Sequence, residues 1–187
     1  MLNYSDYLMV ISLPDAIKNE ISRYKRASVN VIGHFEGMRS TPHIIVTHQT
    51  RCKPFLVHPA IEKMGSRIST IPPIELRING FGYFNHGSRA RTIYALVENT
   101  KQTDNWFKLL KKQMDIKVKN FVPHIVIAGN IPVTAFNKLW PNLVSRSFSE
   151  GFTANSLTIL ERDTYAEYHE YRQYKELFFA NRLKEIF

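Results

Sequence analysis

The sequence predicts an α+β fold with antiparallel sheets and helices on their outer faces. Apolar runs typical of strands alternate with amphipathic segments in the order βα-β-α-ββα-β-α-ββ, which mixes hairpin-like neighbours with single helices. A short stretch also occurs twice, at residues 41–46 and 121–127, and each copy is a proline, a histidine and then an aliphatic run typical of a buried strand. An apolar fraction of 44%, with 12% aromatic residues, indicates a globular protein.

Length and composition limit the number of domains and the compartment. The 187 residues suffice for one well-filled core, so we expect a single domain at residues 1–187. No apolar run approaches the length of a membrane span, and the first residues lack the basic region of a signal peptide, so we expect a cytoplasmic protein without a membrane partner. The single cysteine, Cys52, fits a reducing compartment, and a buried or inert thiol is a better interpretation of it than a nucleophile.

The charge balance is strongly basic. The chain carries 25 Lys+Arg against 16 Asp+Glu, a formal net charge of +9, and the excess is spread along the sequence. Such a surface attracts polyanions, nucleic acid first among them. A solvated, lysine-rich surface that binds nothing explains the same numbers equally well. We predict no obligate protein partner.

The first half of the chain is predicted to alternate strands and helices. Residues 7–13 form a continuous apolar run that ends at Pro14, as a central strand would. Residues 15–28 place apolar side chains at helical spacing, which predicts an amphipathic helix with its charged residues, Lys25 among them, on the outside. The remaining elements of this half are a loop at 33–41, a strand at 43–48, a helix at 54–69 and a strand at 74–78 that continues through 81–84.

The second half begins with a strand at residues 91–98 and a helix at residues 104–114. In that helix Leu109 is expected inside, whereas Lys108, Lys111 and Lys112 are expected on the opposite face. The remaining elements are a strand at 124–128, a helix at 133–144 that Pro141 should break or kink, a strand at 156–161 and a strand at 172–179.

The two repeated histidines are the strongest candidates for chemistry. Because side chains two apart share one face of a strand, His43 lies on the same face as Ile45 and Thr47, and His124 on the same face as Val126. Two imidazoles that titrate near neutral pH can act on a phosphodiester, one taking a proton from the attacking oxygen and the other giving one to the leaving oxygen. This chemistry needs no cofactor and no metal, and the other histidines have no spacing typical of a metal site.

The aromatic residues near the middle of the chain allow two interpretations. Phe81, Tyr83 and Phe84 fall in one predicted strand. They are suited to stacking on a base, as in many ribonucleotide sites, but a role in the sheet and core is the better interpretation.

The sequence resembles the two-histidine (2H) phosphoesterase superfamily, which includes bacterial RNA 2',3'-cyclic phosphodiesterases, also called 2'-5' RNA ligases. That family carries two motifs of histidine, hydrophobic residue, Thr or Ser, about eighty residues apart, and here His43 and His124 are 81 positions apart. The resemblance extends in order through four further segments, at residues 12–14, 74–77, 80–84 and 157–162. It implies two lobes, each an antiparallel sheet backed by helices, with a central cleft that holds one histidine from each lobe.

The chain departs from the family pattern next to both histidines. The Thr or Ser that holds the phosphate oxygens in the family is Ile45 in the first copy and Val126 in the second, and Gly129 stands where close relatives tend to carry Arg. A hydrogen bond to a charged group contributes roughly 1.5 to 3 kcal/mol, so each loss costs about tenfold to a hundredfold in transition-state binding unless it is replaced. Candidate replacements are the hydroxyl of Thr47, roughly 6 to 7 Å along the strand, and four basic side chains, Arg77, Arg89, Arg91 and Lys119.

The resemblance implies a phosphoesterase that hydrolyses a cyclic phosphodiester of RNA ends or of a small nucleotide, with His43 and His124 as the general acid and base. The alternative is a catalytically impaired relative that binds such a nucleotide or RNA end without cleaving it, which the loss of both hydroxyl positions favours. Which histidine is the base, and whether the chain hydrolyses or ligates, are open at the level of sequence.

Overall fold

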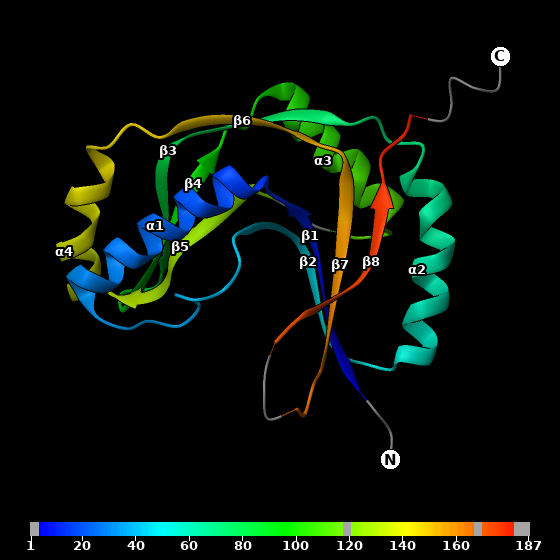
Figure 1. Cartoon of the computed structure of the whole chain (residues 1–187), viewed down its shortest axis with the longest axis horizontal. Coiled ribbons are helices and arrows are strands. Elements are labelled where there is room, and N and C mark those ends of the chain that lie inside the picture. The colour runs from blue at the N-terminus through cyan, green and yellow to red at the C-terminus, as the bar shows by residue number, and fades with distance from the viewer. Residues whose placement is uncertain (1–3, 118–120, 167–169, 182–187) are drawn as a thin grey trace.

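The computed structural model describes residues 4–117, 121–166 and 170–181 of the chain. Two four-stranded sheets stand side by side and four helices pack against them (Figure 1). Every strand pair is antiparallel, so the predicted α+β class with antiparallel sheets is confirmed. None of the helices in the described parts of the chain is long and apolar enough to cross a membrane.

Each sheet draws its strands from both halves of the chain. The first sheet has the order β2-β1-β7-β8, made of β2 (His43–Cys52), β1 (Ser5–Ser12), β7 (Ser156–Asp163) and β8 (Arg172–Phe178). The second has the order β5-β4-β3-β6, made of β5 (His124–Pro132), β4 (Ala90–Val97), β3 (Ile74–His86) and β6 (Ser149–Ala154). The histidine-bearing strands β2 and β5 are therefore both edge strands.

The helices cover the sheets, and the predicted ranges of all four are confirmed to within a few residues. They are α1 (Asp15–Ile32), α2 (Pro54–Ile68), α3 (Lys101–Gln113) and α4 (Val133–Val144). Helix α2 packs against β8 of the first sheet, whereas α1 and α4 pack against strands of the second (Figure 1). Since α1 directly follows β1, its chain crosses from one sheet to the other.

One hydrophobic cluster contains side chains from both sheets and all four helices. Strand β1 is buried along almost its whole length, because it lies between β2 and β7. In the two repeats Ile44 and Ile125 are completely buried. Burying a side chain of this kind stabilises the fold by about 1.5 to 3 kcal/mol. The edge strands β2 and β5 also contact each other across the gap between the sheets, which brings the two repeats together.

Two elements differ from the prediction. Strand β6 was not predicted, because its six residues include Gly151 and only one large apolar side chain, Phe152. It forms an outer edge and pairs only with β3. The predicted break at Pro141 is also wrong, since α4 runs through it to Val144. Pro141 is exposed and lies in the last turn, so the helix loses the single bond that an N–H at this position would donate to the carbonyl four residues before it, and only three residues follow.

Three residues lie on the opposite side of their helix from the one predicted. Lys25 and Lys111 are only 3% and 5% exposed, whereas Leu109 is 37% exposed. Lys25 is four residues after the buried Ile21, and Lys111 is four residues after the buried Phe107, so both fall on the inner faces of their helices. Charge was a poor guide here because the long apolar stem of a lysine can pack into an interface as an apolar side chain does.

Candidate active site

His43 and His124 line one pocket between the two sheets. The pocket has a volume of about 200 Å³. His43 is the first residue of β2 and His124 the first residue of β5, so each sheet supplies one imidazole. The remaining lining residues come from α1, from the loop before β2 and from the repeats themselves: Lys25, Ser40, Thr41, Pro42, Ile45 and Val126.

The sequence around each histidine explains this placement. A proline directly precedes each one, and because proline cannot donate to a strand ladder, both strands begin at the histidine itself. Alternation along the strand then turns the imidazole and the side chain two residues later toward the pocket, while Ile44 and Ile125 turn into the core. Both histidines thus sit at a strand start with their backbones fixed by buried neighbours.

A hydrogen bond and two aromatic rings orient His124. Its Nδ1 lies 2.7 Å from the carbonyl oxygen of Val122, and since a carbonyl only accepts, Nδ1 must donate. In the neutral ring Nε2 therefore holds the lone pair. The rings of Phe84 and Tyr94 pack against the imidazole, with centroids at 4.9 and 5.2 Å. Burial lowers the pKa of His124, and the bond to Val122 opposes that effect.

His43 is held neutral more strongly. Burial, followed by the positive charges of Lys25 and Lys18, lowers its pKa from 6.5 to about 4. Without a ligand, both imidazoles are therefore neutral bases at pH 7. The difference between them is that a carbonyl supports a proton on His124, whereas an ammonium opposes a proton on His43.

Lys25 is a pocket residue that the sequence did not point out. Its Nζ donates to the carbonyl oxygens of Gly37 and Ser40 and to the hydroxyl of Ser40, at 3.1, 2.9 and 2.9 Å. These bonds use all three N–H groups, so Lys25 supplies a fixed positive charge rather than a free donor. Burial lowers the pKa of this ammonium to about 8, which leaves it charged at neutral pH. Its helical register with Ile21 was the one signal in the sequence.

Only some of the other predicted binding residues line the histidine pocket. Ile45 and Val126 line the pocket beside the histidines, so its walls are apolar where the family pattern has hydroxyls. Thr47 does not line it, and neither do Arg77, Arg89 and Arg91. The guanidinium of Arg91 donates instead to the carbonyl oxygens of Gly87 and Ala90, both at 2.8 Å. Lys119 lies outside the described residues.

The three aromatic residues of β3 have separate roles. Phe81 packs against Tyr24 and Tyr83 against Trp140, so both belong to the packing of the second sheet. Phe84 alone reaches the site, through its contact with His124.

A second, open hollow of about 430 Å³ adjoins the histidine pocket and shares Val126 with it. Thr92 is its polar centre. The Thr92 hydroxyl accepts a hydrogen bond from the backbone N–H of Asn130 at 2.9 Å and lies 2.8 Å from Nε2 of His86. Together the two spaces can hold a phosphate and part of the group attached to it. In the described parts of the chain, no three His, Cys, Asp or Glu side chains are grouped to hold a metal ion.

Comparison with known proteins gives one family and several similar folds. The model of the 2'-5' RNA ligase superfamily matches residues 13–166. No curated protein matches the sequence. Among solved structures, TT0787 of Thermus thermophilus is 16% identical, with a TM-score of 0.63 over 94% of this chain and 98% of that one. E. coli LigT complexed with phosphate is 13% identical with a TM-score of 0.63, and LigT complexed with 3'-AMP is 12% identical with a TM-score of 0.62, each covering 95% of this chain and 98% of LigT.

Proposed function

The chain belongs to the 2'-5' RNA ligase superfamily, and we propose that it is a phosphoesterase that hydrolyses a cyclic phosphodiester at an RNA end or on a small nucleotide without a metal. The observation that carries the proposal is the shared pocket of His43 and His124, one from each sheet. The complexes of LigT with phosphate and with 3'-AMP support a phosphate-bearing ligand in a fold of this shape.

The environments of the two imidazoles favour different roles. His43 is the better general base, because the charge of Lys25 disfavours a proton on it. His124 is the better general acid, because Nδ1 donates to the Val122 carbonyl and a positive ring strengthens that bond. A bound phosphate anion raises the pKa of a neighbouring imidazole, so binding itself loads His124 with the proton that it later gives away.

The reaction then follows in one displacement. His43 takes a proton from a water molecule as its oxygen attacks phosphorus. The bond from phosphorus to one ribose oxygen breaks, and His124 donates its Nε2 proton to that leaving oxygen. The product is a linear phosphomonoester, and the starting state is restored when His43 releases its proton and His124 takes one up. The fixed charge of Lys25 attracts the phosphate and partly replaces the hydroxyls that Ile45 and Val126 lack.

The open hollow beside the histidines suits the group attached to the phosphate. It shares Val126 with the pocket, and most of the residues that line it are polar, with Glu36, His86, Thr92 and Asn130. Since a nucleoside has hydroxyls and a ring edge that form hydrogen bonds, it fits a polar hollow of this kind better than an alkyl group does.

Incubation with 2',3'-cyclic AMP and with an oligoribonucleotide ending in a cyclic phosphate, in the presence of EDTA, tests the proposal. We expect linear phosphomonoester from the unmodified protein and at least a thousandfold slower turnover from His43→Ala and from His124→Ala. The exposed His34 provides the matched control, and His34→Ala should turn over normally. Turnover that persists in both pocket variants would refute the proposal.

A second function is favoured by the apolar side chains beside the histidines. With Ile45 and Val126 in place of two hydroxyls, the pocket is also suited to holding a nucleotide or RNA end without cleaving it. Saturable binding without product would support this alternative. Activity that appears only in Ile45→Thr/Val126→Thr would show that the native pocket binds but does not cleave.

A further inference from the structure

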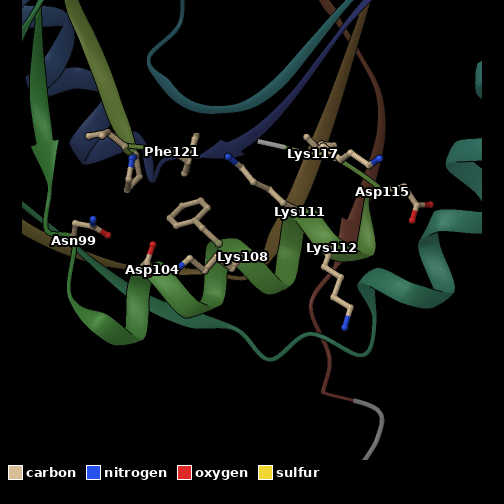
Figure 2. A pocket seen from close by; sticks show the side chains of 12 residues that line it. Asn99, Asp104, Lys108, Lys111, Lys112, Asp115, Lys117 and Phe121 are labelled. Atoms are coloured by element: carbon tan, nitrogen blue, oxygen red, sulfur yellow. Dashed lines mark hydrogen bonds and ion pairs between the residues drawn. The ribbon is translucent and has the colours of Figure 1, made fainter. Parts of the chain in front are cut away.

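A larger pocket lies away from the histidines, between α3 and the segment that leads into β5. Its volume is about 690 Å³, within the range of pockets that hold drug-sized ligands. It shares no lining residue with the histidine pocket. Figure 2 shows its side chains, with lysines from α3 on one side and Phe121 on the other.

Lys111 is the unusual residue of this pocket. Its side chain is 5% exposed, and its ammonium lies 3.4 Å from the centroid of the Phe121 ring (Figure 2). Among the described residues no hydrogen-bond acceptor reaches Nζ. An aromatic face stabilises a cation but does not replace the three acceptors that an ammonium loses on burial. Burial accordingly lowers the pKa of Lys111 to about 8.

The remaining charges around the pocket leave it positive. Its two carboxylates are already paired, Asp104 with Lys108 at 2.6 Å and Asp115 with Arg67 at 2.7 Å. Lys111, Lys112 and Lys117 form no ion pair with any carboxylate in the described parts of the chain. A negative group that enters the pocket therefore meets three uncompensated cations, one of them in a low-dielectric position where attraction is strong.

The other wall of the pocket is apolar and partly aromatic. The rings of Phe107 and Phe121 lie with their centroids 4.9 Å apart and their planes at 54°, and Ile116, Val122 and Pro123 continue the surface. Such a wall stabilises the aromatic body of a ligand, because aromatic rings pack favourably against one another and bury apolar area. A single inorganic anion would leave most of the space unfilled.

We propose that this pocket binds a small organic anion, a planar apolar body that carries one negative group, and that the ammonium of Lys111 is its charged partner. The four-carbon stem of lysine lets the ammonium turn from the Phe121 ring to the anion without movement of the backbone. No residue that lines this site also lines the histidine pocket, although the carbonyl of Val122 accepts the hydrogen bond from His124.

Isothermal titration calorimetry with 2-naphthoate tests the proposal. Two control ligands separate its parts, since acetate has the carboxylate without the aromatic body and 2-naphthol has the aromatic body without the carboxylate. We expect saturable binding of one 2-naphthoate per chain, with acetate and 2-naphthol at least tenfold weaker. Lys111→Met should weaken 2-naphthoate at least tenfold, whereas Lys101→Met, a change at an exposed lysine of the same helix that does not line the pocket, should weaken it less than threefold. Binding should be unchanged in His43→Ala, which separates this site from the histidine pocket.

Proton uptake gives a second measurement. Because an anion raises the pKa of a nearby ammonium, binding at pH 8 should draw up to about half a proton from the buffer in the unmodified protein and in Lys101→Met, but none in Lys111→Met. Lys111→Met keeps the length and burial of the stem, and Lys111→Gln serves as a second uncharged variant. Binding without saturation, equal binding of 2-naphthol, or full binding to both Lys111 variants would overturn the proposal.

Discussion

Lys25 and His43 form the residue pair on which the proposed chemistry depends most. The ammonium is fixed by three hydrogen bonds and cannot turn away from the imidazole, so its charge acts on His43 at every pH below its own pKa of about 8. A base of low pKa beside an acid of higher pKa works best at a pH between the two values.

The pH dependence of turnover follows from these pKa values. The base must be unprotonated, which requires a pH above about 4, and the acid must be protonated, which requires a pH below the lowered pKa of His124. We therefore expect kcat/KM to peak in the acidic range, below pH 6.5. A maximum above pH 7 would contradict this assignment of roles.

Removing the ammonium of Lys25 should move the acidic limb of that profile. In Lys25→Met the pKa of His43 rises, because one of the positive charges that lower it is gone. NMR titration of the His43 ring measures this directly. Lys18→Met provides the control, and since Lys18 is a lesser cause and partly exposed, we expect a smaller rise. Equal shifts in both variants would show that Lys25 has no special role.

Stability should also respond to His43. Its folded pKa of about 4 lies below the unfolded value of 6.5, so protonation favours the unfolded chain. The contribution of neutral His43 to the free energy of unfolding is fully present above pH 6.5. It is lost as the pH falls toward 4, and the loss is at most about 3 kcal/mol. In His43→Gln, denaturant unfolding at pH 7 and pH 4 should differ by less than in the unmodified protein. An unchanged difference would exclude His43 as a cause of acid instability.

At the scale of the elements, most of the fold could be predicted because each strand and helix has its own pattern. The apolar run of β1 and the amphipathic stripes of α1 and α3 identify elements without tertiary information. Strand β6 has no such pattern, since it depends on its pairing with β3. The burial of Lys25 likewise depends on a distant loop that offers acceptors at Gly37 and Ser40, which helical periodicity does not reveal.

Two glycines give a matched test of packing within the elements. A Cβ on Gly82 of β3 would lie 2.8 Å from the ring of Tyr94, which packs against His124. Gly82→Ala should therefore lower the free energy of unfolding by about 1 to 3 kcal/mol and slow turnover. A Cβ on Gly65 of α2 meets only a methyl of Leu177, at 3.5 Å, so Gly65→Ala should be neutral or stabilising by up to about 1 kcal/mol. Thermal unfolding of both variants measures the contrast, which equal stabilities would contradict.

At the scale of the whole molecule, the pocket exists because two edge strands from different sheets meet. The repeated proline-histidine pattern and the resemblance to a family predicted that His43 and His124 would face a common cleft, and the structure gives them a common pocket. The position of Lys25, the charged residue of this pocket, depended on the crossing of α1 from one sheet to the other. No periodicity in the sequence carries that information.

The net charge of +9 should act on long ligands more than on short ones. Counterion release makes RNA affinity fall steeply with salt, in proportion to the number of phosphates contacted. With His43→Ala to prevent turnover, we expect the affinity for a cyclic-phosphate-ended oligoribonucleotide to fall at least tenfold between 50 and 200 mM salt, and that for 2',3'-cyclic AMP to fall less. Fluorescence anisotropy of a labelled oligoribonucleotide measures the first affinity, and its displacement by 2',3'-cyclic AMP measures the second. If salt lowers both affinities by the same factor, the oligoribonucleotide contacts the protein only through the histidine pocket.

The most direct test of the two-histidine pocket is an NMR titration of both imidazoles, with and without 2'-AMP, one of the two linear phosphomonoesters that 2',3'-cyclic AMP can give. If one phosphate lies between the rings, its negative charge raises the pKa of both, that of His43 from about 4 and that of His124 from its own lowered value. A rise at both rings is the predicted result. Titration curves that 2'-AMP at saturating concentration leaves unchanged at either ring would contradict the account.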